Sequence, residues 1–232
     1  MEMNIMFSPK TLDFLLENRM HDSKEWFLGN KQQYNEFVLE PLAELTRSLS
    51  PFMLSVDHRI ITDAKIGRVI SRIYRDTRFS KDKRIFRDSM WLSFSRDSKS
   101  FSCCPEFFFV IAQDCFLYGT GYYCAASQTM ENMRSMVLSG DKAYLAAKKA
   151  VASQNIFTID GEMYKRSRFP EASPEDRQWL DRKNISLIRR STDFDLLFSD
   201  TLADTLVSDF SKLIPVYNFF TDMTLSRGEN AR

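Results

Sequence analysis

The residues best suited to chemistry in this chain are nine lysines and arginines that crowd the 23 residues from Lys65 to Arg87. Only two aspartates lie among them, so this basic segment carries a charge of +7, although the whole chain of 232 residues carries only +1. Arginine offers a planar fork of N–H donors that matches the oxygens of phosphate and carboxylate groups, and lysine adds a mobile point charge. The pattern therefore indicates a segment that faces anions.

Within the basic segment we expect a strand that ends near Thr77, followed by a loop. Side chains alternate along a strand, so Arg72 and Asp76 would share one side of it while Arg75 points to the other. The loop would then bring further basic side chains toward the end of the strand. The candidate anion-binding residues are Arg72, Arg75, Arg78, Lys81 and Lys83.

Asp76 is the candidate orienting residue of this site. It lies between Arg75 and Arg78, and neighbouring positive charges lower the pKa of a carboxyl group. We therefore expect Asp76 to stay ionised and to hold an arginine in place, and the sequence identifies no catalytic residue. Lys183 could bring a further positive charge to the same site, although a surface helix end explains it equally well.

The basic segment has three interpretations, and the sequence leaves all three open. Arginines and aspartates at a strand end often form ordinary ion pairs on a solvated surface. Among functions, we place first the binding of a small molecule with a phosphate or carboxylate group, with or without catalysis. An interaction module for nucleic acid or an acidic protein ranks lower, because nucleic-acid binding usually needs a wider positive surface or exposed stacking aromatic residues.

The sequence contains no other strong chemical motif. His21 and His58 have no second ligand at helical or hairpin spacing, and the four cysteines form no C-x-x-C pair, so we predict no metal site. Gly119 and Gly121 are not followed by a helix, which does not fit a phosphate-binding glycine loop. The sequence indicates no particular cofactor.

The elements expected to position the basic segment are those of an α+β domain: a mainly antiparallel sheet flanked by helices. Apolar spacing predicts a helix after Pro9, a helix from Ser23 that Pro41 kinks or divides, and two C-terminal helices after Ser199. Successive strands with short connections favour antiparallel pairing. The predicted strands are 66–77, 90–95, 106–113, 116–123 and 185–188.

The middle of the chain should add further elements to this domain. We predict a helix that Ser127 caps and Gly140 ends, a second helix that Asp141 caps and that reaches about Val151, and a short helix opened by Ser173. A hairpin over 157–164 would turn at Asp160-Gly161, because this dipeptide suits the positive φ angles of a tight turn. We expect one domain over 1–225, with or without two lobes, and a flexible tail over 226–232.

The N-terminal residues MEMNIMFSPK lack the basic segment, apolar run and cleavage site of a secretory signal. The uncharged apolar run over 107–113 is far shorter than the roughly 20 residues that a helix needs to span a bilayer. We therefore expect a soluble, cytoplasmic protein with no membrane partner. The sequence does not indicate its oligomeric state.

Four motifs follow one another along the chain in a specific order. They are Trp26-Phe27, the string R-I-Y-R-D-T-R-F-S-K-D-K from Arg72 to Lys83, Gly119-x-Gly121-Tyr122, and a late Arg182-Lys183. Their order resembles the bacterial and fungal family known as domain of unknown function 2461, and the resemblance covers nearly the whole chain. That family has no established activity, so the resemblance implies where the site lies and implies no reaction.

The chain departs from the family pattern directly after Lys83. The pattern usually continues with Thr/Ser-Pro-Tyr-Lys, whereas this chain continues with Arg84-Ile85-Phe86-Arg87. A proline and a phenolic hydroxyl are thereby lost, while Phe86 keeps the ring and Arg87 keeps the charge. Anion binding therefore survives the change better than a mechanism that uses a tyrosine proton.

Overall fold

The computed structural model describes residues 7–96 and 104–225, and these residues form two compact units. The predicted tail over 226–232 lies outside the described residues. The fold is α+β with an antiparallel sheet, as the sequence predicts. The described part of the first unit comprises 7–94, 108–117 and 190–207, and that of the second comprises 95–96, 104–107, 118–189 and 208–225.

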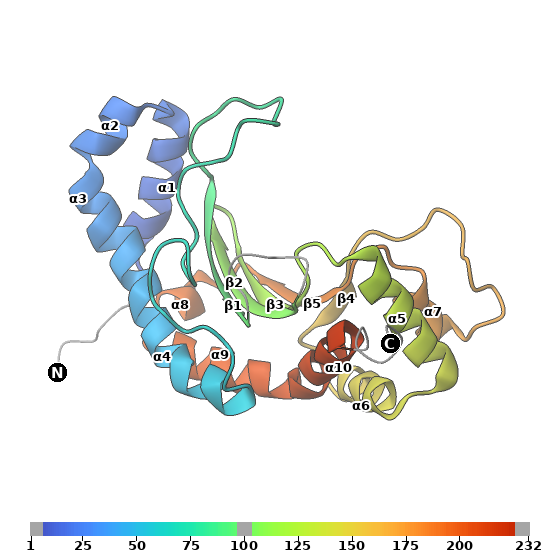
Figure 1. Ribbon diagram of the computed structural model, residues 1–232. Coiled ribbons are helices and arrows are strands. Elements are labelled where there is room, and N and C mark those ends of the chain that lie inside the picture. The colour runs from blue at the N-terminus through green and yellow to red at the C-terminus, as the bar shows by residue number, and fades with distance from the viewer. Residues whose placement is uncertain (1–6, 97–103, 226–232) are drawn as a thin grey trace. The chain divides into compact units, whose positions relative to one another are not determined.

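The first unit begins with a series of helices, drawn in blue in Figure 1. Ser8 precedes the first helix and Pro9 occupies its first turn, where the missing N–H of proline costs nothing. The predicted helix from Ser23 is divided into several pieces. The elements are α1 (Pro9–His21), α2 (Lys24–Gly29), α3 (Lys31–Tyr34), the π-helical segment η1 (Asn35–Leu39) and α4 (Glu40–Val56).

Pro41 explains why the chain changes its winding just before α4. Proline has no N–H, so the carbonyl of Phe37 four residues earlier loses its helical donor. The hydroxyl of Thr11 on α1 donates to that carbonyl instead, at 2.6 Å. Thr11 is fully buried, so this bond joins α1 to the π-helical segment inside the unit.

The basic segment is an irregular ribbon, and the prediction of a strand over 66–77 is wrong. It pairs with later residues only through isolated bridges, one of which joins Tyr74 to Phe86. The amide of Arg75 donates to the carbonyl of Ile85 at 2.9 Å. This bond encloses residues 76–84, all of which the structure describes. Among them, the single backbone–backbone hydrogen bond runs from the amide of Ser80 to the carbonyl of Thr77.

Two aspartate side chains shape the loop that follows residue 75. The carboxylate of Asp76 accepts from the amide of Arg78 at 3.2 Å, and that of Asp82 accepts from the amide of Arg84 at 3.1 Å. Such local side-chain bonds offer the backbone an alternative to the ladder of a sheet. Residues 76–84 therefore form a loop, which Figure 1 shows in teal beside α1 and α2.

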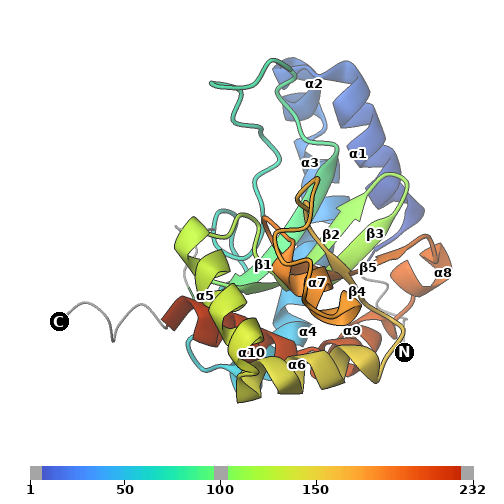
Figure 2. The same ribbon diagram turned by 90° about the vertical axis from the view of Figure 1, so that its right-hand side faces the viewer.

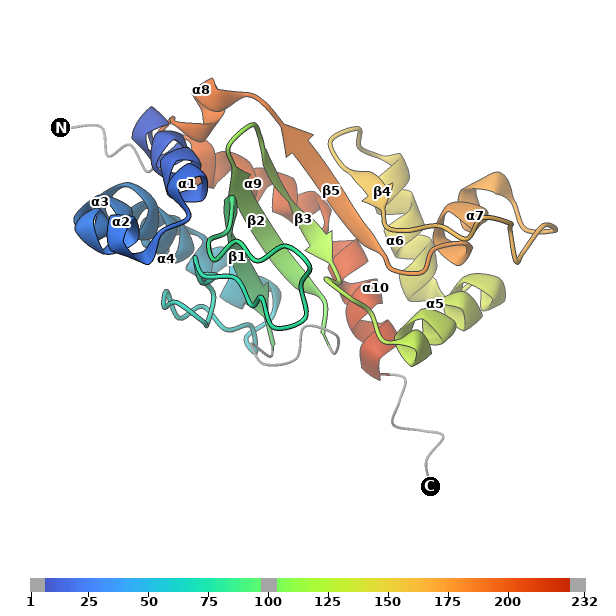
Figure 3. The ribbon, with the colours of Figure 1, turned by 90° about the horizontal axis from the view of Figure 1, so that it is seen from above.

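The sheet has five strands in the order β1-β2-β3-β5-β4, which Figure 3 shows from above. Strand β4 pairs with β5 in an antiparallel register, so the predicted hairpin over 157–164 is wrong. Gly161 does provide a turn with a φ of 129°, but Met163 beyond it bridges to Arg182. The strands are β1 (Ser89–Ser95), β2 (Glu106–Ala112), β3 (Phe116–Gly121), β4 (Thr158–Asp160) and β5 (Ser186–Ser191).

Helices of the second unit pack around an aromatic core. The helix α10 contacts both α5 and α6, and α5 contacts α7. Figure 2 shows α5, α6 and α10 side by side. The rings of Tyr144, Trp179 and Phe219 meet inside this unit with centroids 5.6–5.8 Å apart. The helices are α5 (Ser127–Ser139), α6 (Lys142–Ala152), α7 (Pro174–Leu180) and α10 (Ile214–Leu225).

Two further helices complete the described chain, namely α8 (Phe194–Leu197) and α9 (Leu202–Lys212). The predicted helices after Ser199 are therefore confirmed, with the boundary between them at Leu213 and with Pro215 in the first turn of α10. Helix α8 was not predicted. Across the residues that the structure describes, no helix combines the length and apolarity that a membrane span requires.

Candidate anion-binding site

A polar pocket of about 300 Å³ lies in the first unit between the end of α1 and the basic segment. Four arginines and two aspartates give its lining a formal charge of +2, and a serine adds a hydroxyl group. The lining residues are Arg19, Arg75, Asp82, Arg84, Arg87, Asp88 and Ser89.

The carboxylate of Asp82 is the common partner of three of these arginines. Its Oδ2 atom lies 2.6 Å from Nη1 of Arg75, 2.8 Å from Nη2 of Arg84 and 3.4 Å from Nη2 of Arg19. Its Oδ1 atom accepts from Nε of Arg84 at 3.1 Å. Hydrogen bonds from Arg84, and then from Arg75, hold the pKa of Asp82 far below its ordinary range.

The end of α1 brings Arg19 to the pocket. Asp22 follows the last turn of α1 in the left-handed conformation, with a φ of 44°. Its carboxylate accepts from the amides of Ile85 at 2.8 Å and Phe86 at 3.1 Å. Arg19, whose side chain is 14% exposed, donates to the carbonyl of Phe86 at 2.7 Å. These contacts fix the position of the arginine against the basic segment.

Aromatic packing fixes the basic segment from its other side. Phe86 is fully buried, and its ring centroid lies 5.1 Å from that of Phe27 and 4.9 Å from that of Tyr74.

Arg87 donates from Nε to the carbonyl of Arg72 at 3.0 Å, and its guanidinium lies 4.6 Å from the ring centroid of Trp91. The arginine is thus held by a backbone bond and by a cation–π contact.

Asp76 and Arg78 form a separate ion pair on the loop. Nη2 of Arg78 lies 2.6 Å from Oδ2 of Asp76, and Nε lies 2.9 Å from Oδ1. Side-chain and backbone hydrogen bonds from Arg78 lower the pKa of Asp76 to about 2. Asp76 therefore holds an arginine, but neither residue belongs to the lining of the pocket described above.

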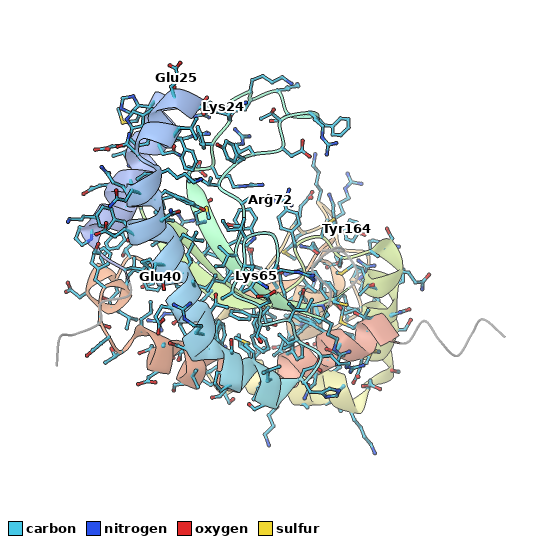
Figure 4. The ribbon with its side chains drawn as sticks, turned by 60° about the vertical axis from the view of Figure 1, so that its left-hand side comes forward. Lys24, Glu25, Glu40, Lys65, Arg72 and Tyr164 are labelled. Atoms are coloured by element: carbon cyan, nitrogen blue, oxygen red, sulfur yellow. The ribbon has the colours of Figure 1, made fainter. Side chains whose placement is uncertain are left out.

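Of the five basic residues predicted to bind an anion, Arg75 is the one that lines the pocket. Lys83 donates to the carbonyl of Thr77 at 3.0 Å, and Lys81 is exposed on the same loop. The guanidinium of Arg72 lies over the turn at Gly67, 3.4 Å from where a Cβ would sit there. Figure 4 shows Arg72 in the part of the basic segment that precedes the loop 76–84.

Lys183, the further contributor considered from the sequence, belongs to the second unit. It forms an ion pair with Glu162, and its Nζ lies 5.8 Å from the ring centroid of Tyr164. Arg134 and Arg168 also lie over this ring, at 5.6 and 5.1 Å. Lys183 thus has a local structural role within its own unit.

The family model described as conserved hypothetical protein (DUF2461) matches residues 10–219. The chain belongs to this family. No curated protein matches it. The matched range includes every residue that lines the pocket, so the pocket lies within the part of the chain that defines membership of DUF2461.

Three arginines of the pocket were missing from the sequence-based set of site residues in this DUF2461 chain. Arg84 and Arg87 lie in the basic segment, directly after the string from Arg72 to Lys83. Arg19 lies 63 residues before Asp82, in the last turn of α1. Apart from its charge, no residue pattern around it indicates a binding site. Only the tertiary contact between α1 and the segment reveals it.

The pocket offers donors for anions and few ligands for metals. Its aspartates, Asp82 and Asp88, are accompanied by four guanidinium groups. Within residues 7–96 and 104–225, the His, Cys, Asp and Glu side chains form no group of three suited to a metal ion. The arrangement can hold an oxyanion by charge-assisted hydrogen bonds, and guanidinium groups remain charged throughout the physiological pH range.

Proposed function

We propose that the chain binds a small anionic molecule, through its phosphate or carboxylate group, in the pocket formed by α1 and the basic segment. The observation that supports this proposal is the convergence of four guanidinium groups on one concavity with a formal charge of +2. An ordinary ion pair requires one cation for each carboxylate. Here three arginines share the carboxylate of Asp82, so the lining retains a capacity for further negative charge.

Partial burial makes two of these arginines well suited to binding. The side chains of Arg19 and Arg75 are 14% and 22% exposed, so water screens them less than it screens a surface lysine. A hydrogen bond to a charged group contributes about 1.5–3 kcal/mol. Three such bonds contribute up to about 9 kcal/mol, and an association cost of about 4 kcal/mol or more leaves an affinity in the millimolar to submillimolar range.

Arg75 and Arg78 provide a matched pair of variants for testing this function. Both lie on the same segment and both pair with an aspartate, but only Arg75 lines the pocket. We expect inorganic phosphate or malonate to raise the melting temperature of the wild type and of Arg78→Gln. In Arg75→Gln the affinity should fall at least about tenfold, because one charge-assisted bond is lost.

The melting temperature of each variant is first measured without any anion, so that the shift reports binding and not the stability of the variant. If no anion stabilises the wild type, the proposal is wrong. It is also wrong if both variants respond equally, because binding would then depend on the general charge of the segment.

A second candidate function is contact with nucleic acid or an acidic protein partner through the loop 76–84. Phe79 supports it, because this side chain is 95% exposed and the Arg78 guanidinium lies 5.8 Å from its ring centroid. Lys81 and Lys83 are exposed nearby. Exposed aromatic rings and basic side chains on one loop are typical of single-strand binding surfaces.

Salt dependence separates the two functions. Binding of nucleic acid releases counterions, so its affinity should fall steeply between low and moderate salt concentration. Binding of a small anion to the pocket should change much less. The measurement is a fluorescence titration of a labelled oligothymidylate at several salt concentrations, with Phe79→Ala as the variant. Failure of the oligonucleotide to bind at low salt would exclude single-stranded DNA as the partner.

A further inference from the structure

The hydrogen bonds around Asp82 crowd unevenly on one oxygen atom. Three guanidinium groups, from Arg19, Arg75 and Arg84, all donate to Oδ2. The distance to Arg19 is 3.4 Å, longer than the 2.7–2.9 Å that is usual for a charge-assisted N–H···O bond. A carboxylate offers only two oxygens, so it does not give each guanidinium group an acceptor of its own.

We infer that the pocket is built for the dianionic phosphate group of a phosphate monoester, and that the carboxylate of Asp82 occupies its place in the free protein. The inference rests on the proposed function and names the ligand class. A phosphate monoester presents three terminal oxygens in a tetrahedral array. Each of Arg19, Arg75 and Arg84 can then donate to a separate oxygen.

Competition with Asp82 decides between phosphate and carboxylate ligands. Asp82 belongs to the same chain, so its effective concentration at the arginines is of millimolar order or higher. A free carboxylate brings the same group and the same charge, and therefore has little to gain by displacing it. A phosphate dianion brings a second negative charge and a third oxygen to a lining whose formal charge is +2.

The backbone around Asp82 permits this displacement. Asp82 lies in the loop between Arg75 and Ile85, whose backbone groups form the last hydrogen bond between the two sides of the ribbon. Within this loop the one backbone–backbone hydrogen bond runs from the amide of Ser80 to the carbonyl of Thr77. The carboxylate can therefore turn outward without breaking the pairing of the ribbon, but it gives up its bond from the amide of Arg84, a residue that is exposed to solvent. Arg19 is anchored on α1, and Arg75 lies at the paired end of the ribbon.

Two probes and two variants test the inference at pH 7.5. Phenyl phosphate and phenyl sulfate share a ring and a tetrahedral head group, but the phosphate is mainly a dianion at this pH because its second pKa is about 6. Asp82→Asn removes the competing charge and keeps the size of the side chain. Asp76→Asn is the control, because it removes a negative charge from the same loop at a residue outside the pocket lining.

Isothermal titration calorimetry should show that the wild type binds phenyl phosphate at least about tenfold more tightly than phenyl sulfate. Asp82→Asn should tighten the binding of phenyl phosphate about fivefold or more. The uncharged amide competes for the arginines less than the carboxylate of Asp82 does, so a larger fraction of the protein is ready to bind the phosphate group. Asp76→Asn should change it less than about twofold.

Equal binding of the two probes by the wild type would overturn the inference and leave the proposed function intact. Weaker phosphate binding by Asp82→Asn would also overturn it, since Asp82 would then be a residue that positions the arginines for the ligand. If neither probe binds the wild type or Asp82→Asn, the inference fails, and the proposed function fails with it when inorganic phosphate and malonate also leave the melting temperature of the wild type unchanged. The comparison of probes on the wild type needs no variant, so the test does not depend on the folding of Asp82→Asn.

Discussion

Replacing Asp22 by alanine should detach the basic segment from the end of α1 and destabilise the fold by about 2–4 kcal/mol. The carboxylate of Asp22 accepts two backbone N–H bonds, from Ile85 at 2.8 Å and from Phe86 at 3.1 Å. The side chain of Phe86 is fully buried. Loss of the acceptor leaves these two amides without this partner, at a cost of about 1–3 kcal/mol for each one that stays buried.

A backbone effect adds to this loss. Asp22 has a φ of 44°, in the left-handed region that aspartate and asparagine adopt more readily than alanine. Asp22→Asn is therefore the matched variant, because it tolerates the same conformation and keeps a carbonyl oxygen as an acceptor. We expect it to lose less than about 1.5 kcal/mol, since only the charge of the acceptor changes.

Urea denaturation, with the free energy of unfolding extrapolated to water, measures both variants. The expected order of stability is wild type, Asp22→Asn and Asp22→Ala. If Asp22→Ala lay within about 0.5 kcal/mol of the wild type, the bonds from Asp22 would not fix the segment to α1. Anion affinity should fall along the same series, because Arg19 reaches the pocket from α1.

Two further predictions concern the ionisation of Asp76 and the packing of Gly119. By NMR, the carboxyl of Asp76 should titrate with a midpoint of about 2, because Arg78 stabilises its ionised form, and Arg78→Gln should return the midpoint toward 3.8. The pair therefore contributes to stability above pH 3.8, and this contribution is lost as the pH falls toward 2; a wild-type midpoint near 3.8 would disprove it. Gly119→Ala should cost about 3 kcal/mol or more in thermal melts, because its Cβ would lie 1.8 Å from the carbonyl oxygen of Leu187; an unchanged melting temperature would refute this.

The helices that could be predicted from the sequence are those whose ends depend on neighbouring residues. Gly140 ends α5 in the left-handed conformation with a φ of 65°, and Asp141 then caps α6 by accepting from the amide of Ala143. Ser173 caps α7 in the same way. Such signals act over two or three residues, so the sequence contains all that is needed to detect them.

The backbone conformation of the basic segment could not be predicted from the sequence. Its alternating pattern, with Ile73 buried and Arg72 exposed, is the same for a strand and for an irregular ribbon. What breaks the predicted strand is a turn over 65–70, where Gly67 has a φ of 78° and the amide of Ile70 donates to the carbonyl of Lys65 at 3.2 Å. The predicted hairpin over 157–164 is wrong for a different reason, because the strand that pairs with β4 is β5, which lies much later in the chain.

The pocket itself depends on contacts between distant residues. Arg75 could be selected from the sequence, because it lies in the densest basic stretch. Arg19 could not, since it meets Asp82 only when the end of α1 docks on the segment through Asp22. Arg78 has the charge that an anion site needs, but it pairs with Asp76 outside the pocket lining.

The most direct measurement of anion binding in this pocket is a crystal structure of the chain grown with phenyl phosphate. We predict that the phosphate group contacts Arg19, Arg75 and Arg84, and that the carboxylate of Asp82 has moved away from these arginines. A phosphate group bound only to exposed side chains of the loop, such as Arg78 or Lys81, with the bonds of Asp82 unchanged, would contradict the proposed site.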